Sequence, residues 1–395
     1  MRISLVTRIF SPEPGAASFR LSAVAQSCAE KSHAVTVFTS TPPPGLSSDV
    51  ELDEPAVTVR RARVLRDRAG YVRGYLQYMS FDIPLVLRLI VSRRADVVLV
   101  EPPPTTGAVV RLVCALRRIP YAYYAADIWS DASQTAGAPG LVVTFVRWLE
   151  RFAMRGAQLV LSVSDGVTQR LRELGVTANV RTVGNGSDLT AFSPEGPTQR
   201  ISAPYFIYTG TASEVHGARI FVDAFRKVRR DHPEAALVYV GQGSDFPAIT
   251  ESAESMADGA IQVLPRTSPA EIARWLRGAT AALASVKPGV GYDFAFPTKM
   301  YAATSCGTPV IYAGTGPGRD FIDEVGYGIA SDYDVDSVAA AMRDMLDTTT
   351  TVSDRGRAAA WARENVDITA VAARVRGALE AIASSRTRRH QQKPI

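Results

Sequence analysis

Short apolar runs alternate with helical patterns along almost the whole chain, and this alternation limits the fold more than any other feature. In the first half, the expected strands are Ile3–Thr7, Ala34–Thr39, Val97–Val100, Tyr121–Ala125, Leu159–Val163 and Val180–Val183. The helical stretches between them include Phe19–Glu30, Ile83–Arg93, Gly107–Arg117 and Leu141–Arg155. Nearly all-apolar strands separated by helices predict a parallel sheet that is covered on both faces. We therefore expect an α/β, doubly wound domain.

The alternation breaks in the middle of the chain and then starts again. Gly184–Asp188 and Phe192–Pro197 are typical of a turn and a linker. The strands expected after this break are Tyr205–Tyr208, Ala236–Val240, Ile261–Leu264, Ala281–Ala284 and Val310–Tyr312. The helices expected with them are Ile220–Arg230, Pro269–Arg277, Thr298–Ser305, Val335–Leu346 and Arg355–Ala383. Because 395 residues exceed one ordinary core, we predict two such domains, with a cleft lined by the carboxyl ends of both sheets.

The expected domain boundaries follow from this pattern. Residues 1–192 form a first Rossmann-like domain, and residues 193–360 form a second one. Residues 361–384 form a helix that packs back on the first domain, and residues 385–395 form a disordered basic tail.

Composition narrows the class of protein. A hydrophobic content of 46% with 21% charged residues is that of an ordinary globular chain, and no apolar run reaches the roughly 18 residues of a membrane span. The three cysteines lack zinc spacing and cannot all pair, so we expect them in the core of a cytoplasmic protein. Arginines crowd one stretch of the first half: Arg60, Arg61, Arg63, Arg66, Arg68 and Arg73. They are either a solvated surface or a peripheral contact with acidic lipids, because motifs for nucleic acid are missing.

One helix start in the second half is suited to an anion. Phe296, Pro297, Thr298 and Lys299 precede a helical run that ends before Gly307 and leads into a strand. Pro and Thr suit a first turn, where Thr can cap the helix. The free backbone N–H groups and the helix dipole favour a phosphate beside Lys299.

Three loops that follow strands complete this site. Gly210 follows one strand, and Gly241 and Gly243 follow the next. Glycines there allow a ligand to approach the backbone or simply make tight turns. Arg266 and Thr267 follow a third strand, where they would meet a phosphate and a base edge.

In the first half, side chains after strands suit an acceptor molecule. Gly15 and Ala16 lie in a small-residue loop before a helix that carries Arg20, and the loop lacks the full dinucleotide spacing. Glu101 and Asp127 each follow an apolar strand and would orient or deprotonate an acceptor. Helix caps or ion pairs with arginines explain both carboxylates equally well. Trp129 would wall a sugar ring or simply pack.

Other chemistry finds little support. His216 is the one histidine near the expected phosphate site, as a ligand contact or as a cap. Neither a Ser-His-Asp set nor a metal constellation appears, so we expect catalysis without a metal or a covalent serine.

Taken together, these short motifs resemble those of the group 1 (family GT4) glycosyltransferases of the GT-B architecture, in the subgroup with a Pro-Ser/Thr-Lys helix start. The matching segments are Phe10–Ala17, Asp127–Trp129, Val163–Ser164, Gly184–Asp188, Phe192–Pro194, Gly210, Gly241–Gly243, Pro297–Lys299 and Cys306–Val310. The arginine- and alanine-rich composition resembles that of high-GC actinobacteria.

The resemblance implies a retaining transfer of a sugar from a UDP- or GDP-linked donor, with no further cofactor. The donor would bind the second domain and the acceptor, a small metabolite or a lipid-linked saccharide, the first. The lack of an amphipathic, aromatic-rich anchor helix favours the metabolite, whereas the arginine cluster favours the lipid. The leaving diphosphate would take the acceptor's proton in a front-face attack, and catalysis would depend on stabilising charge on that diphosphate.

The chain departs from the family pattern at four positions. The usual Arg and Lys after the first glycine are replaced by Thr211 and His216, and the usual pair of glutamates by Phe294 and Ala302. The glutamate at the second of these positions normally grips the ribose. We expect an active enzyme, and the alternative is a non-catalytic protein that binds a nucleotide sugar. An epimerase or phosphorylase of the same architecture is a weaker alternative.

Overall fold

The chain divides into two compact units, each built on its own parallel sheet. The computed structural model describes residues 1–13, 15–43, 46, 55–67, 72, 74–135, 137–176, 179–256, 259–348 and 351–391, with side chains as far as residue 385. The first unit comprises Met1–Asn185 with Ile368–Ile395, and the second comprises Gly186–Asp367. Arg68 and Arg73 of the basic stretch lie outside the described residues.

The sheet of the first unit has seven parallel strands in the order β3-β2-β1-β4-β5-β6-β7. The strands are β1 (Arg2–Val6), β2 (Ala34–Ser40), β3 (Val57–Ala62), β4 (Val97–Val100), β5 (Tyr121–Ala125), β6 (Leu159–Ser162) and β7 (Val180–Thr182). All four residues of β4 and all five of β5 are buried, as the apolar runs predicted. The doubly wound α/β domain is therefore confirmed.

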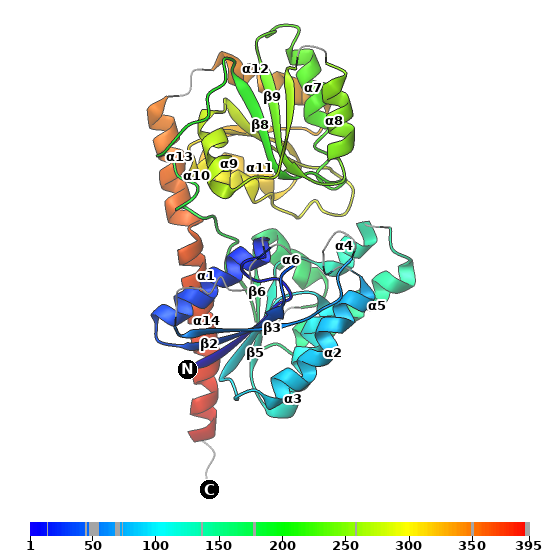
Figure 1. Ribbon diagram of the computed structural model, residues 1–395, viewed down its shortest axis with the longest axis vertical. Coiled ribbons are helices and arrows are strands. Elements are labelled where there is room, and N and C mark those ends of the chain that lie inside the picture. The colour runs from blue at the N-terminus through cyan, green and yellow to red at the C-terminus, as the bar shows by residue number, and fades with distance from the viewer. Residues whose placement is uncertain are drawn as a thin grey trace. The chain divides into compact units, whose positions relative to one another are not determined.

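Helices cover both faces of this sheet (Figure 1). They are α1 (Ala16–Glu30), α2 (Tyr75–Val91), α3 (Pro104–Arg117), α4 (Trp129–Thr135), α5 (Gly140–Arg155), α6 (Asp165–Glu173) and α14 (Ile368–Gln391). Helix α1 packs against α14 on one side, and α2, α3 and α5 form a layer on the other. This split follows from right-handed crossovers, because the chain steps one way from β1 to β2 and the other way from β3 through β6.

The sheet of the second unit has six parallel strands in the order β10-β9-β8-β11-β12-β13. The strands are β8 (Tyr205–Thr211), β9 (Ala236–Gln242), β10 (Ile261–Pro265), β11 (Ala281–Val286), β12 (Val310–Gly314) and β13 (Gly328–Ser331). The helices are α7 (Ile220–Val228), α8 (Phe246–Glu254), α9 (Pro269–Gly278), α10 (Lys299–Ser305), α11 (Pro317–Val325), α12 (Val335–Asp347) and α13 (Val352–Asn365).

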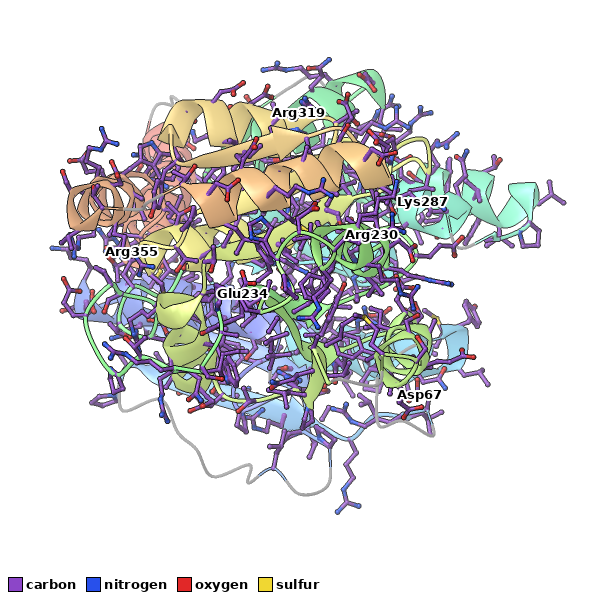
Figure 2. The ribbon with its side chains drawn as sticks, turned by 90° about the horizontal axis from the view of Figure 1, so that it is seen from above. Asp67, Arg230, Glu234, Lys287, Arg319 and Arg355 are labelled. Atoms are coloured by element: carbon purple, nitrogen blue, oxygen red, sulfur yellow. The ribbon has the colours of Figure 1, made fainter. Side chains whose placement is uncertain are left out.

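Two hydrophobic clusters sandwich this second sheet. Along β8, Phe206 and Tyr208 belong to the cluster under α7 and α12, whereas Tyr205 and Ile207 belong to the cluster under α9 and α10. The alternation is the period of two that a strand buried on both faces requires. On the rim of the unit, Arg319, labelled in Figure 2, donates to the carbonyls of Gly314 and Ser331.

Several elements differ from the sequence expectation. Strand β3 was not predicted, because it mixes half-exposed valines with Arg60 and Arg61 and reads as part of a charge cluster. Helix α14 begins at Ile368, and it continues through residues 385–391, where we expected a disordered tail. Residues 392–395 lie outside the described residues.

The expectation that the chain lacks an amphipathic, aromatic-rich anchor helix stays a prediction, although α5 exposes aromatic side chains. Helix α5 buries Val143, Ala153 and Met154, while Phe145 and Trp148 are each 56% exposed. No helix in the described part of the chain is long and apolar enough to cross a membrane. Cys28, Cys114 and Cys306 are free thiols in the core, as expected.

Candidate active site

In the second unit, glycines let the ends of β8 and β9 pass each other closely. Gly210 pairs with Gly241 in the register of the two strands. A Cβ on Gly241 would lie 2.0 Å from the Gly210 carbonyl oxygen, and one on Gly243 would lie 1.9 Å from that of Ala212. A Cβ on Gly210 would point into open space, although its φ of +88° favours glycine. Gly241 and Gly243 thus allow the two loops to approach each other closely, and Gly210 and Thr211 are exposed at the carboxyl end of the sheet.

Gly243→Ala is expected to lower the free energy of unfolding of the second unit by about 2–4 kcal/mol. The added methyl meets backbone, which cannot swing aside, and φ is +140°. The matched control is Gly356→Ala in α13, where nothing lies within 4 Å of the new Cβ; it should raise stability by about 0.5–1 kcal/mol. Denaturant titration of both variants measures the difference, and equal effects would contradict the close approach.

Lys299 lies against the end of β8. Its Nζ donates to the Thr211 carbonyl oxygen at 3.3 Å and sits 3.4 Å from the centre of the Tyr208 ring. Among the described residues, no carboxylate forms an ion pair with it. Burial lowers the pKa of this ammonium well below its ordinary value. An anion that entered here would restore the stability of the charged form.

His216 completes the polar edge of the site. Its Nδ1 lies 2.8 Å from the Ser213 Oγ, and its carbonyl accepts a hydrogen bond from the Ser285 Oγ at the end of β11. Burial, with a smaller contribution from the nearby charge of Lys299, lowers the pKa of His216 to about 4. His216 is therefore neutral at pH 7, and it both closes a turn and lies beside Lys299.

The low pKa of His216 predicts a loss of stability in mild acid. The unfolded chain binds a proton below its ordinary pKa of about 6.5, whereas the folded chain does so only below about 4. Stability should therefore fall by about 2 kcal/mol between pH 6.5 and pH 4, allowing for water around the half-buried ring. In His216→Asn this part of the pH dependence should vanish, as urea titrations at both pH values would show. An unchanged slope would contradict the assignment.

The start of α10 is simpler than we expected. The helix begins at Lys299, and Thr298 occupies the N-cap position with helical φ and ψ and no capping hydrogen bond, so the capping prediction was wrong. Phe296 stacks against Tyr301, and Ala302 packs on the core with it. Gly307, with φ of +68°, ends the helix as predicted.

The remaining predicted donor residues lie around this edge. Arg266 and Thr267 are exposed directly after β10, the strand beside β9. Pro297 and Thr298 precede Lys299 in the chain. Lys287, labelled in Figure 2, follows β11, and its backbone N–H donates to the Val215 carbonyl.

In the first unit, Arg20 and Glu101 form a buried ion pair. Arg20 is 4% exposed and Glu101 3%. Arg20 also donates to the Asn185 Oδ1 at 2.8 Å and lies over the Tyr124 ring. The carboxylate that we expected to face an acceptor is thus bound to an arginine, one of the two alternatives left open by the sequence.

Asp127 and Trp129 follow β5. Asp127 accepts a hydrogen bond from the Ile128 N–H at 2.8 Å. The backbone N–H of Trp129 donates to Glu150, a carboxylate of α5 that is 1% exposed and whose pKa is raised by burial to about 7. The Trp129 ring meets Tyr78 edge-on, with the Arg8 guanidinium over both rings. Sequence patterns gave no signal for Arg8 or Glu150.

The loop before α1 is held by two arginines of the basic stretch. Arg66 binds both carboxylate oxygens of Glu13, at 3.0 and 2.8 Å, and Arg61 donates to the Ser11 carbonyl. Gly15 and Ala16 are exposed at the start of α1. At least these two arginines therefore order a loop of the protein itself.

Among the described residues, no group of three His, Cys, Asp or Glu side chains is arranged so that it could hold a metal ion. What the second unit offers instead is a cation, exposed backbone and a neutral histidine. This combination suits an anionic ligand.

Two family models match the chain and account for most of it. A glycosyl transferase 4-like domain matches residues 15–186, and a model of the glycosyl transferases group 1 matches residues 203–348. The chain belongs to the group 1 glycosyltransferases. No curated protein sequence matches it.

Solved structures of other proteins show the same GT-B fold as this chain. Sucrose-phosphate synthase from Thermosynechococcus elongatus is 16% identical over 99% of this chain and 98% of its own, with a TM-score of 0.69. Anabaena Alr3699/HepE in complex with UDP-glucose is 16% identical over 96% and 100%, with a TM-score of 0.72. WaaG, a glycosyltransferase of lipopolysaccharide biosynthesis, is 12% identical over 95% and 99%, with a TM-score of 0.70. The α/β GT-B architecture of this glycosyltransferase is thus confirmed.

Proposed function

We propose that this chain is a retaining glycosyltransferase of the GT4 type that takes a sugar from a UDP- or GDP-linked donor. The observation that carries the proposal is Lys299, an ammonium without a carboxylate partner among the described residues, beside the exposed end of β8 at Gly210 and Thr211. The UDP-glucose complex of the similar Anabaena protein supports a donor of this class. The donor binds the second unit, and the acceptor binds the first.

The chemistry follows from charge. As the bond between the anomeric carbon and the diphosphate oxygen breaks, negative charge grows on the diphosphate, and Lys299 stabilises it. The acceptor oxygen attacks the same face, its proton passes to the leaving diphosphate, and the new glycosidic bond keeps the anomeric configuration. Arg266, exposed after β10, adds a second cation. We therefore assign the positive charge that balances the diphosphate to side chains rather than to a metal ion.

In the first unit, Asp127 is the proposed acceptor-orienting carboxylate. Glu101 acts through Arg20, whose guanidinium it holds, and is therefore a positioning residue. The acceptor is a small metabolite or a lipid-linked saccharide that reaches Gly15, Ala16 and Trp129.

One experiment tests the reaction. The protein is incubated with UDP- and GDP-linked sugars and with lipid and metabolite extracts, with and without EDTA, and the product's anomeric proton is followed by NMR. We expect transfer with retention that EDTA does not abolish. Inversion, or loss of activity with EDTA that added metal restores, would contradict the mechanism.

A second candidate is a non-catalytic protein that binds a nucleotide sugar. Ala302 and Thr211 favour it, because they occupy positions where the family pattern has a ribose-binding glutamate and an arginine. Binding of UDP or GDP without transfer to any acceptor would select this candidate.

A further inference from the structure

The outer layer of helices in the first unit exposes an unusual amount of apolar side chain. We call the outward surface of α2, α3 and α5 the α2–α3–α5 face. These helices pack side by side on one side of the sheet (Figure 1). Large side chains of this face that are more than half exposed include Ile83 (68%), Leu87 (64%), Val91 (71%), Leu116 (72%), Leu141 (87%) and Trp148 (56%). Contiguous exposed apolar surface of this kind marks an interaction site.

The apolar residues lie in stripes along the helices. Ile83, Leu87 and Val91 follow one another at four-residue steps on α2, so they share one side of that helix. On α5, Leu141, Phe145 and Trp148 follow at steps of four and three residues and so share one side of the helix, with Phe145 stacked on Trp148. A stripe that would normally face a core thus faces outward on two helices of one layer.

The charges of this face have one sign. The three helices contain two acidic residues, Asp82 and Glu150, and both are 1% exposed. They contain six arginines: Arg88, Arg111, Arg117, Arg147, Arg151 and Arg155. Among the described residues, no ion pair involves any of the six. Arg88 and Arg111 donate to backbone carbonyls, Arg117 to carbonyls and the Ser92 Oγ, and Arg147 to the neutral side chain of Gln134. Arg155 is exposed and the other five arginines are half-buried, so the layer combines an apolar surface with positive charge that no carboxylate at the surface of these helices balances.

The apolar surface and the positive charge together decide whether a second copy of the chain or a lipid bilayer covers this face. A second copy of the chain meeting this face with its own would bring like charges together without a carboxylate to compensate them. An anionic bilayer offers both complements, because the acyl region takes up the apolar side chains and the lipid phosphates pair with guanidinium groups. Aromatic residues such as Trp148 and Phe145 are favoured at that boundary.

We propose that the α2–α3–α5 face docks the enzyme on a membrane surface of anionic lipids. The docking face belongs to the first unit, and the donor site belongs to the second. If the proposed function also holds, a lipid-linked acceptor becomes the favoured class, because docking brings the first unit to its source.

Vesicle sedimentation of the full chain tests the docking. Vesicles of phosphatidylcholine alone are compared with vesicles that also contain phosphatidylglycerol, at low and high salt. We expect strong binding only with phosphatidylglycerol, weakened by salt. The double variant Phe145→Ser with Trp148→Ser should weaken binding by about tenfold or more, since two apolar anchors are lost. Val352→Ser, which removes an apolar residue that is 87% exposed in the second unit, is the matched control and should bind as the wild type does.

A variant with altered charge provides an independent test if the aromatic variant folds poorly. Arg147→Glu with Arg155→Glu should also weaken binding to anionic vesicles and flatten its salt dependence. The proposal is overturned by equal binding to both kinds of vesicle, by variants that bind as the wild type does, or by a dimer in sedimentation equilibrium that the aromatic variant dissociates. Calorimetry with UDP and GDP separates the two proposals: the face variants should keep nucleotide binding, and a loss of nucleotide binding in the wild type would refute only the donor site.

Discussion

Replacing Lys299 by methionine is expected to weaken the binding of UDP or GDP by about a hundredfold, or about 2.7 kcal/mol. Methionine keeps an unbranched apolar side chain and removes the charge that lies over the Tyr208 ring. A charge-assisted contact with a diphosphate is worth about 1.5–3 kcal/mol, and it is worth most where water is scarce around the ammonium. Isothermal titration calorimetry at pH 7 measures the change.

The matched control for this variant is Lys227→Met. Lys227 lies on α7 of the same unit and is paired with Asp336 at the surface. Nucleotide binding should stay within about twofold of the wild type, because a surface ion pair contributes less than about 1 kcal/mol and lies away from the glycine loops. If Lys227→Met weakened binding as much as Lys299→Met, the effect would be one of overall charge.

Replacing Arg20 by methionine is expected to cost about 3–5 kcal/mol of stability in the first unit. The substitution leaves the Glu101 carboxylate, 3% exposed, without its buried partner. A second replacement, Glu101→Leu, should recover much of the loss in the double variant, because it removes the stranded charge. Chemical denaturation of the single and double variants measures both changes.

Glu173→Gln serves as the control for this pair. Its carboxylate, 50% exposed, pairs with Arg170 on the surface of α6, so its loss should cost about 0.5 kcal/mol or less. If Arg20→Met and Glu173→Gln had equal effects, Arg20 and Glu101 would not form a buried pair.

The sequence predicted those parts of the fold that rest on local pattern. Fully buried strands such as β4 and β5 were predicted from the sequence, because every residue in them is apolar or aromatic. Strand β3 was not predicted, because it contains Arg60 and Arg61 and has no apolar run. It forms because it pairs with β2. The boundary of a strand at a sheet edge is decided by a neighbour that is distant in sequence.

The sequence predicts the candidate donor site because loops after parallel strands gather at one edge of a sheet, and that the donor binds there stays a prediction. The contacts that give the site its chemistry were not predicted. Lys299 donates to the carbonyl of Thr211, which precedes it by 88 residues, and its Nζ lies over the ring of Tyr208. From the sequence, Tyr208 was expected only to be a strand residue. Likewise, nothing local in the sequence pairs Arg20 with Glu101.

The α2–α3–α5 face was hidden for a different reason. Stripes of leucine, isoleucine and aromatic residues at helical spacing are what a core-facing helix also shows. Only the packing of the first unit reveals that residues such as Leu87 and Leu141 are exposed.

The pKa of Lys299 tests most directly whether this lysine binds the diphosphate of the donor. NMR titration of the lysine side-chain nitrogen, assigned by its absence in Lys299→Met, gives the pKa with and without UDP. A pKa well below the ordinary value of about 10.4 in the free protein, rising when UDP binds, is the predicted result. UDP binding that leaves the pKa of Lys299 unchanged would contradict its role as the diphosphate anchor.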